Sequence, residues 1–499
     1  MTTPIQSYPT YFAGQWRDAS GPLYTTEYPF DGSAVATLHA ATVADVDEAV
    51  QFAEHARQQP AWANLLPHER AGILYRIAQG IRVRSEELAH LQRLDNGKPM
   101  PETRALVASA VGTFQYFAAV AETFEDTVTP QRGPFLTLSL HQPLGVVGAI
   151  TPWNSPIASE AQKIAPALAA GCAVVVKPAE ITPRMAIELA RIAEAAGLPP
   201  GILSVLPGKG SIVGDALVKH PLVKRIAFTG GTQVGIGVAR QAAEKLMPVS
   251  LELGGKSPTI VCADADLDHA VAGVLYGIFS SSGESCIAGS RAFVHASVYA
   301  EFKRRLVAGA QALRLGDPAL DSTQMGPLIS SSHRASVERY VQLGLDEGGI
   351  LLCGGGRPSG SIYDKGYFHQ PTIFEGLANG TRLCQEEVFG PVLALLPWDT
   401  EADLVAQCNN NVYGLACGIW SRDFQTALRL GKAIQTGTVW VNTYKLFSIS
   451  TPFGGMGQSG VGREKGRASI AEYMTQKSYY LGLNPAPLPW AGLPISSAP

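Results

Sequence analysis

The sequence predicts an α/β protein with two α/β domains in series, the first built on a Rossmann-like, doubly wound sheet. From residue 173 onward, short and nearly all-apolar runs alternate with amphipathic stretches of helical length, a pattern typical of parallel βαβ units. A second series of this kind begins after Gly254-Gly255 and continues to about residue 443. A chain of 499 residues is also too long for one ordinary domain.

The first 150 residues are expected to form strands and turns, then helices, then two further strands. Residues 11–38 contain short alternating segments broken by glycine and proline, which predicts strands and turns. Apolar residues then recur at helical spacing. This spacing predicts helices over residues 42–58, 67–97 and 102–124. Residues 136–141 alternate and residues 145–150 are apolar, which predicts two strands.

The two α/β series supply most of the remaining elements. In the first series, strands are expected at residues 173–176, 202–206, 225–228 and 249–253, and helices at 182–196, 211–219 and 235–245. In the second series, strands are expected at 259–262 and 291–295, and helices at 266–280 and 298–313. The late segment 477–483 is β-like and, with 136–141, stands outside both series.

Composition and charge exclude several classes of function. The formal net charge is -3, and both signs are dispersed without a basic stripe, so a nucleic-acid partner is not expected. No apolar run of 18 residues is present, so no membrane span is expected. The first 14 residues lack a basic start followed by an apolar core, and we therefore expect a cytoplasmic protein.

The seven cysteines do not form a metal or disulfide pattern. Their spacings are wide and no CxxC pair exists, so neither zinc nor a disulfide framework is expected. Most of them should be small buried hydrophobic residues. Cys286 is different because it lies in a small, glycine-rich segment after an expected helix. A thiol in such a segment could be exposed enough to act as a thiolate nucleophile.

Two polar residues stand at positions where they could assist a nucleophile. Glu252 lies between two apolar residues beside paired glycines, and burial would raise its pKa toward that of a useful base. The alternative is a salt-bridged structural glutamate. Asn154 follows an apolar strand, and its amide could donate a hydrogen bond to a developing oxyanion. The alternative is an asparagine that caps the following helix.

Two glycine-rich turns are candidates for binding a dinucleotide. The segment 208–214 resembles the GxGxxG pattern but has one residue too many. The segment 228–235 follows a strand and opens a helix, and its Gly230 and Gly231 would let backbone N–H groups approach a pyrophosphate. An ordinary turn between strand and helix is the alternative for each. Lys177 and Glu180 end another strand, where ligands of open α/β sheets bind.

Together these segments resemble the aldehyde dehydrogenase superfamily, in the order of that family and over most of the chain. The matching segments are TPWN at 151–154, KPAE at 177–180, FTGG at 228–231, LELGGK at 251–256, GESCIAGSR at 283–291, EEVFGPV at 386–392, WVN at 440–442 and PFGGMGQSGVGRE at 452–464.

The resemblance implies a role for each matching residue. Cys286 matches the nucleophile, Glu252 the general base for deacylation, and Asn154 with the backbone N–H of Cys286 the oxyanion hole. The residues implied in cofactor binding are Trp153, Lys177, Glu180, Gly230, Gly231, Glu387 and Phe389. No metal is implied. The sequence departs from common family patterns at Glu284, Gly231 and Gln233, and it has serine at 155 and 280, where many members carry aromatic residues of the substrate tunnel wall.

The resemblance also implies a domain plan and a reaction. It places a coenzyme-binding domain at 1–124 and 145–254, a catalytic domain at 255–465, and a small β oligomerisation extension at 125–144 and 466–499. The implied assembly is a dimer or tetramer. The implied reaction oxidises an aldehyde to a carboxylic acid through a cysteine thioester, with NAD as the cofactor and NADP as the alternative. Two alternatives remain: a CoA-acylating relative, and a non-catalytic structural or binding protein on the same fold.

Overall fold

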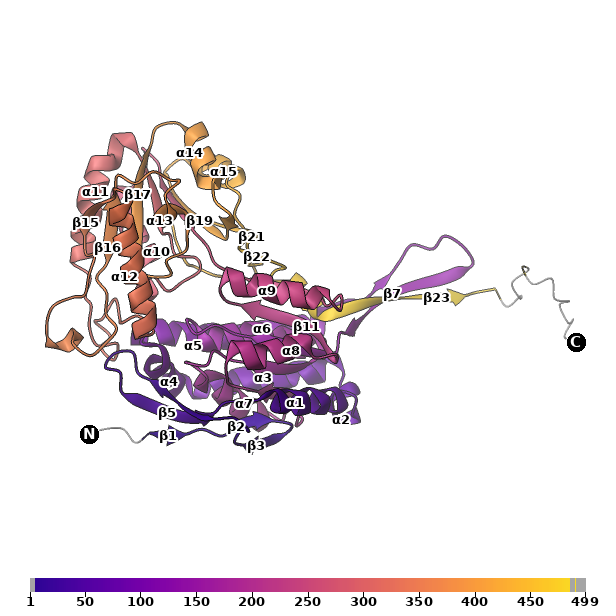
Figure 1. Cartoon of the computed structure of the whole chain (residues 1–499). Helices are drawn as coiled ribbons and strands as arrows, with labels where there is room; N and C mark the ends of the chain where they lie inside the picture. The colour runs from indigo at the N-terminus through magenta and orange to yellow at the C-terminus, as the bar shows by residue number, and fades with distance from the viewer. Residues whose placement is uncertain (1–4, 485–489, 491–499) are drawn as a thin grey trace, which may run out of the picture.

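The computed structural model describes residues 5–484 and residue 490, which form two lobes and a projecting arm (Figure 1). The first lobe surrounds a six-stranded sheet and contains the helices of the first half of the chain. The second lobe surrounds a seven-stranded sheet. The arm carries strands β7 and β23 away from both lobes, on the right of Figure 1. The fold is therefore α/β, as the sequence predicts.

The first sheet has the strand order β10-β9-β8-β11-β12-β22. Its strands are β8 (Val146–Ile150), β9 (Ala173–Lys177), β10 (Leu203–Val205), β11 (Val223–Thr229), β12 (Val249–Glu252) and β22 (Gly460–Val461). The first five run parallel, and β22 pairs antiparallel with β12. The chain order reverses between the neighbours β8 and β11. Such a reversal leaves a crevice at the carboxyl ends of the strands, where ligands of open α/β sheets bind.

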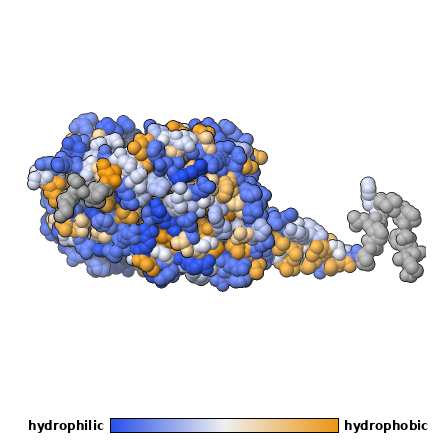
Figure 2. Space-filling view, turned by 90° about the horizontal axis from the view of Figure 1, so that it is seen from below, coloured by the Kyte–Doolittle hydropathy of each residue, from blue (hydrophilic) through white to orange (hydrophobic). Residues whose placement is uncertain are grey.

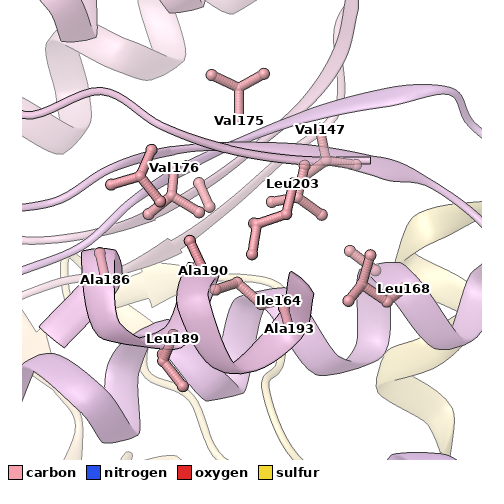
Figure 3. Close-up of a cluster of buried hydrophobic side chains, with 14 of the residues drawn as sticks. Val147, Ile164, Leu168, Val175, Val176, Ala186, Leu189, Ala190, Ala193 and Leu203 are labelled. Atoms are coloured by element: carbon pink, nitrogen blue, oxygen red, sulfur yellow. The ribbon is translucent and has the colours of Figure 1, made fainter. Parts of the chain in front are cut away.

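Helices cover both faces of this sheet. They are α1 (Val43–Ala56), α2 (Pro60–Ala63), α3 (Pro67–Val83), α4 (Ser85–Asn96), α5 (Met100–Thr123), α6 (Pro156–Ala170), α7 (Arg184–Ala195), α8 (Asp215–Lys219) and α9 (Thr232–Ala243), with a π-helical turn at Gly210–Gly214. Figure 3 shows Leu168 on α6 and Leu189 on α7 beneath the strands that carry Val147 and Val176. These side chains belong to one buried core, and burying each large one contributes roughly 1.5–3 kcal/mol.

The expected helix over residues 67–97 is in fact two helices, α3 and α4. The helical geometry breaks at Arg84, whose φ is -99° and ψ is 17°. The guanidinium group of Arg84 donates to Glu87 at 2.9 Å and to Glu188 on α7 at 2.7 Å. Apolar periodicity carries no information about this contact between distant helices, so the sequence did not reveal the break.

Helix α5 is, among the described residues, the one helix long and apolar enough to cross a membrane by length and composition. Its position is that of a core helix. It packs against α3 and α6, and its Phe114 and Phe117 are fully buried. The expectation of a helix over residues 102–124 is confirmed, and the helix begins at Met100.

The second sheet has the strand order β15-β16-β17-β14-β13-β19-β20. Its strands are β13 (Pro258–Val261), β14 (Arg291–His295), β15 (Ile350–Cys353), β16 (Thr372–Glu375), β17 (Val392–Trp398), β19 (Ala416–Trp420) and β20 (Thr438–Val441). Its helices are α10 (Leu267–Phe279), α11 (Ala296–Gln311), α12 (Ser331–Asp346), α13 (Arg382–Gln385), α14 (Glu401–Asn409) and α15 (Phe424–Ala433). All neighbours run parallel except β15 and β16.

Smaller sheets complete the lobes. They are formed by β1 (Gln6–Ser7), β4 (Leu23–Glu27) and β5 (Ala34–His39), by β2 (Thr10–Phe12) and β3 (Gln15–Arg17), and by β18 (Tyr413–Gly414) and β21 (Met456–Gly457). The strands expected over residues 11–38 are therefore present. Strand β22 was not foreseen: residues 460–461 lie in the range expected for the second domain, yet they pair with the first sheet, Gly460 beside Glu252.

The arm is a three-stranded antiparallel sheet of β6 (Thr127–Val128), β7 (Phe135–Pro143) and β23 (Met474–Gly482). The strands expected at 136–141 and 477–483 are confirmed, and they pair with each other along their length, from Phe135 beside Gly482 to Pro143 beside Met474. Figure 2 shows apolar residues along the projecting arm. Residues 485–489 and 491–499 of the expected oligomerisation segment lie outside the described residues.

Candidate active site

A cavity of about 650 Å³ opens at the carboxyl ends of β8, β9 and β11. We call it the strand-end cavity. Five of the residues predicted to bind a cofactor line it: Trp153, Lys177, Glu180, Gly230 and Gly231. Both glycine-rich turns reach it, since Gly210 and Gly214 of the earlier turn are also in the lining. The structure therefore brings together segments that the sequence offered as two separate candidates.

The geometry of Gly231 fits a phosphate-containing ligand. Gly231 is the N-cap residue of α9, and no side chain caps this helix. A Cβ atom at Gly231 would meet nothing within 4 Å, so the space in front of the backbone is open. The uncapped N–H groups of a helix N-terminus attract anions. The turn can therefore accept the pyrophosphate of a dinucleotide, and the ordinary-turn alternative leaves this open face unexplained.

Two charged residues stand on the wall of the strand-end cavity. Lys177 ends β9, and its Nζ donates to the carbonyl oxygen of Pro178 at 2.6 Å. Burial lowers the pKa of Lys177 to about 8. Glu180 follows three residues later and is half-buried on the same wall. Both groups are placed to form hydrogen bonds to a sugar hydroxyl of a bound ligand.

Cys286 follows a tight turn in which consecutive residues adopt left-handed backbone conformations. The φ angles are 57° at Ser281, 54° at Ser282 and 75° at Gly283. A Cβ atom at Gly283 would lie 2.2 Å from the backbone of Gly390, so only glycine fits. This close approach places the turn against the segment that carries Glu387 and Phe389.

Hydrogen bonds from helix α5 and a neighbouring loop hold this turn. The backbone N–H of Ser281 donates to one carboxylate oxygen of Glu102 at 2.7 Å, and its hydroxyl donates to the other at 2.8 Å. The hydroxyl of Ser282 donates to the carbonyl oxygen of Gly326 at 2.9 Å. The chain therefore presents Cys286 from a turn fixed at several points.

Cys286 is distinguished from the other cysteines by its exposure. All seven are free; six are buried and Cys286 is partly exposed. Burial, followed by the charges of Glu387 and Glu252, raises the pKa of the Cys286 thiol to about 12, against the opposing charge of Lys445. The thiol is therefore protonated at neutral pH. Its addition to an electrophile requires a nearby proton acceptor.

Glu252 meets that requirement. It ends β12 with 4% of its surface exposed. Neither carboxylate oxygen has a hydrogen-bond partner within the described part of the chain, so the alternative of a salt-bridged structural glutamate is wrong. Burial, followed by the charge of Glu464, raises the pKa of Glu252 well above its ordinary value. A carboxyl group in this state is tuned toward acid–base chemistry.

Glu252 and Cys286 belong to touching segments. A Cβ atom at Gly255, three residues after Glu252, would lie 2.5 Å from the carbonyl oxygen of Cys286. The charge of Glu252 also contributes to the raised pKa of the Cys286 thiol. The chain crossing from the first sheet to the second therefore brings the candidate base beside the candidate nucleophile.

Asn154 also points toward the cysteine turn. Its Nδ2 donates to the carbonyl oxygen of Glu284 at 3.1 Å, two residues before Cys286. The N-cap residue of α6 is Ser155, so the alternative in which Asn154 caps this helix is wrong. The amide is thereby held on the backbone that leads into Cys286, where it can reach an oxygen atom formed at the thiol.

Glu387 and Phe389 lie outside the lining of the strand-end cavity, between it and Cys286. The carboxylate of Glu387 accepts from the N–H of Gly255 at 3.0 Å, and burial raises its pKa to about 7. The ring of Phe389 lies 5.3 Å from that of Trp153, which lines the cavity. Phe389 therefore contacts the wall of the strand-end cavity, and the charge of Glu387 acts on the thiol of Cys286.

Sequence reasoning missed a buried ion pair next to Glu252. Lys163 on α6 forms a salt bridge with Glu464 and donates to the hydroxyl of Thr229 at 2.7 Å. The charges of Lys163 and Glu464 both act on the pKa of Glu252. A lysine inside a helix made mostly of alanine and other apolar residues was the signal that could have revealed this pair.

Glu284 was noted only as a departure from the family pattern, and the structure shows that it is buried. Its carboxylate accepts from the N–H of Ile329 at 2.8 Å. Burial raises its pKa to about 8, although the charge of Lys98 acts in the opposite direction. The position next to the nucleophile turn therefore carries a second acidic group that the sequence did not assign.

The molecule combines a cavity at the reversal point of a parallel sheet with a partly exposed cysteine beside an unpaired buried carboxyl group, and this combination defines an oxidoreductase of the α/β dehydrogenase class. The sequence model of the aldehyde dehydrogenase family matches residues 16–479. The betaine aldehyde dehydrogenase of Cereibacter sphaeroides is 42% identical over 95% of this chain and 96% of its own. The chain therefore belongs to the aldehyde dehydrogenase family.

Solved structures agree with this assignment. An aldehyde dehydrogenase from Bacillus cereus, solved as an NAD+ complex, superposes with a TM-score of 0.94 at 37% identity over 96% of this chain and 97% of its own. The betaine aldehyde dehydrogenase of Staphylococcus aureus, also solved with NAD+, gives 0.95 at 34% identity over 97% of this chain and 96% of its own. The fold of the chain is the aldehyde dehydrogenase fold.

Proposed function

We propose that this enzyme oxidises an aldehyde to a carboxylic acid with NAD through a thioester on Cys286. The observation that carries the proposal is the unpaired, buried carboxyl group of Glu252 beside the one partly exposed cysteine. A buried carboxyl group without a partner costs free energy, and a proton-transfer role gives a reason for keeping it at this position.

In the first step, the Cys286 sulfur bonds to the aldehyde carbon. The ionised form of Glu252 takes the thiol proton and then releases it to solvent. The carbonyl oxygen becomes an oxyanion, and the Asn154 amide and the backbone N–H of Cys286 donate hydrogen bonds to it. NAD, when bound, accepts the hydride that leaves this carbon and so supplies the oxidation.

The second step releases the acid. Glu252 takes a proton from water, the resulting hydroxide attacks the thioester carbon, and the carbon–sulfur bond breaks. The leaving sulfur then recovers the proton from Glu252, which regenerates the thiol. Trp153, Lys177, Glu180, Gly230 and Gly231 would hold the adenosine and pyrophosphate portions of the cofactor, and Glu387 and Phe389 the nicotinamide portion.

A spectrophotometric assay tests the proposed reaction. The purified protein is mixed with NAD and a panel of aldehydes, with and without CoA, and absorbance of NADH is followed. We expect NADH formation without CoA and a free carboxylic acid as the product. Strict dependence on CoA, with an acyl-CoA product, would establish the CoA-acylating alternative instead. A correctly folded protein that binds NAD and oxidises no aldehyde would support the non-catalytic alternative.

We propose a division of labour among the parts of the chain. Residues 1–124 and 145–254 would bind the coenzyme, residues 255–465 would carry the chemistry, and residues 125–144 and 466–499 would mediate assembly as a dimer or tetramer. The exposed apolar residues of the arm support the last part: Val128, Tyr480, Leu481 and Leu483 are 65%, 71%, 44% and 59% exposed. An unpaired apolar strand edge invites association. Sedimentation that shows a stable monomer at micromolar concentration would contradict the assembly.

We also propose a cytoplasmic location. All seven cysteines are free thiols, which is typical of a reducing compartment. Fractionation of cells that express the tagged protein tests this location, because recovery in a secreted or membrane fraction would contradict it.

A further inference from the structure

The neighbourhood of Cys286 contains a cation that the proposed reaction does not use. Lys445 follows β20 in a loop where its own φ is 56°, a left-handed conformation that lysine seldom adopts. Its Nζ donates to the hydroxyl of Ser280 at 2.8 Å and lies 3.5 Å from the Ser280 carbonyl oxygen. Ser280 begins the turn that presents Cys286.

The ammonium group of Lys445 lies close enough to the thiol to act on it electrostatically. Its charge lowers the pKa of Cys286, in opposition to the larger effect of burial. Other charged groups that act on Lys445 are Glu102 and Lys98. The ring of Tyr276, half exposed to solvent, lies 5.9 Å from its Nζ.

The positive charge in this region is incompletely neutralised. Within residues 5–484, neither Lys445 nor Lys98 forms a salt bridge with a carboxylate, because none lies within 4 Å of either ammonium group. Glu102 is the acidic group whose charge acts on both lysines, and its two oxygens accept the two Ser281 hydrogen bonds. An anion entering beside Ser280 would find a donor with a full charge.

Among the lysines near Cys286, Lys445 is the least buried and is therefore the candidate for binding a substrate. Lys98 and Lys465 retain only 5% and 4% of their exposure. Lys465 also lies 3.6 Å from the centre of the Phe447 ring, and the carboxylates of Glu464 and Glu252 act on it. Lys445 is half-buried, and its Nζ donates to the hydroxyl of Ser280, a neutral partner that a carboxylate on a substrate can replace.

The residue that accepts from the lysine, Ser280, is small and polar, and so is Ser155 at the start of α6. The hydroxyl of Ser155 lies 3.0 Å from that of Ser159, and the hydroxyl of Ser280 donates to the carbonyl oxygen of Tyr276 at 2.6 Å. Aromatic faces attract cations, whereas hydroxyl and ammonium groups bind anions.

On the basis of the proposed function, we infer that the substrate is an aldehyde carrying a carboxylate, and that Lys445 binds this carboxylate while the aldehyde carbon meets Cys286. This charge is opposite to that of betaine aldehyde, the substrate in the names of two of the relatives above. Lys445 is thus the residue that selects the charge of the substrate.

The experiment compares three probes that differ in charge: succinic semialdehyde, which is anionic, butanal, its uncharged analogue, and betaine aldehyde, which is cationic. The value of kcat/KM is measured with saturating NAD at pH 7, where Lys445, with a pKa of about 8, is protonated. We expect the wild type to favour succinic semialdehyde over butanal by on the order of tenfold to a hundredfold, the range for a charge-assisted hydrogen bond.

Variants at Lys445 then test its role. Lys445→Gln should bring the ratio of succinic semialdehyde to butanal close to one, chiefly through KM, and Lys445→Arg should preserve it. Lys445→Glu should improve betaine aldehyde relative to succinic semialdehyde. Because the loss of charge also affects the thiol, the ratio between probes is the readout, since an effect on Cys286 acts on all probes alike. Lys432→Gln, on the exposed face of α15, is the matched control and should leave the ratio unchanged.

Two results would overturn the inference. One is a wild-type enzyme that prefers butanal or betaine aldehyde over succinic semialdehyde. The other is a ratio of kcat/KM for succinic semialdehyde to butanal that stays unchanged in Lys445→Gln. In both cases butanal oxidation would continue, so the proposed function would stand. Absence of NADH formation with every probe would instead overturn the proposed function, and this inference with it. If Lys445→Gln is unstable, the wild-type preference and the Lys445→Arg variant still decide the question.

Discussion

The two ends of the active site, the strand-end cavity and the region around Cys286, contain different kinds of chemical groups. The strand-end cavity is lined largely by glycines and apolar side chains, and its turn at Gly231 offers backbone N–H groups. The region around Cys286 contains buried ionisable groups instead, among them Glu252, Glu387 and Lys465. The first arrangement recognises a ligand by shape and by fixed dipoles. In the second arrangement, around Cys286, buried ionisable groups remain without a neutralising partner, so they can exchange protons with reacting groups.

This difference separates binding from chemistry. Fixed backbone donors bind a phosphate without any change of protonation. Buried carboxyl and thiol groups have shifted pKa values because their charged forms are desolvated, and these groups exchange protons during a reaction. Changes near the thiol should therefore reduce the rate strongly, and changes in the strand-end cavity should mainly alter the choice of cofactor. Four substitutions test this contrast.

The largest effect is expected for Cys286→Ala. Without the sulfur no thioester can form, so aldehyde oxidation should fall by at least about 10³-fold, while NAD binding, measured by calorimetry, should be retained. Cys353→Ala, which removes a thiol that is 9% exposed in the second lobe, is the matched control and should keep near-normal activity. Ordinary turnover by a folded Cys286→Ala protein would remove the basis of the proposed mechanism.

The next effect is expected for Glu252→Gln. A neutral amide cannot accept a proton, so steady-state turnover should fall by roughly 10²- to 10⁴-fold, with slower release of the acid from the thioester. A pre-steady-state burst of NADH reports the earlier step. A burst of unchanged rate would confine Glu252 to hydrolysis, whereas a slowed burst would support its role as acceptor of the thiol proton.

The pH dependence of the same pair of proteins sharpens this test. Because the folded protein raises the pKa of Glu252 well above its ordinary value, the active carboxylate is the minor form at low pH. The wild-type rate of thioester hydrolysis should therefore rise with pH through this raised pKa. In Glu252→Gln that rise should disappear, and its persistence would assign the titration to another group.

A smaller loss is expected for Asn154→Ala. The side chain supplies one of the two proposed donors to the oxyanion, and loss of one such donor costs about 10²- to 10³-fold in kcat. KM should change much less, because the oxyanion exists only after the sulfur has added. Asn409→Ala, which removes an amide that donates to the Ala433 carbonyl oxygen, provides the comparison. Equal losses in both variants would indicate a general effect on the fold.

The smallest effect is expected in the strand-end cavity, for Glu180→Gln. A carboxylate there accepts hydrogen bonds from ribose hydroxyls and repels a 2′-phosphate, so the wild type should prefer NAD. Lys177, nearby on the same wall, softens the repulsion. The substitution should shift the ratio of kcat/KM for the two cofactors toward NADP by roughly fivefold. Equal use of both cofactors by the wild type would contradict the assignment.

The two ends also differ in how well the sequence predicted them. Five residues of the strand-end cavity were named from the sequence, because glycine turns after apolar strands have a local signature, and their roles in cofactor binding followed from the family resemblance. The roles of Cys286, Glu252 and Asn154 followed from the family resemblance, and the residues themselves could not exclude a capping asparagine or a salt-bridged glutamate. The ion pair of Lys163 and Glu464 joins positions 301 residues apart, a separation that no local pattern detects.

The sequence by itself determined the alternation of strands and helices in most of the chain, the α/β class and the family, since hydrophobic periodicity, glycine turns and motif order are local properties of the chain. Only the tertiary structure decided that Glu252 has no hydrogen-bond partner among the described residues, that burial raises the pKa of the Cys286 thiol, and that Lys445 lies beside Ser280. The physical reason is that desolvation and charge interactions depend on which distant segments exclude water from a group. Neighbours in the sequence do not report this.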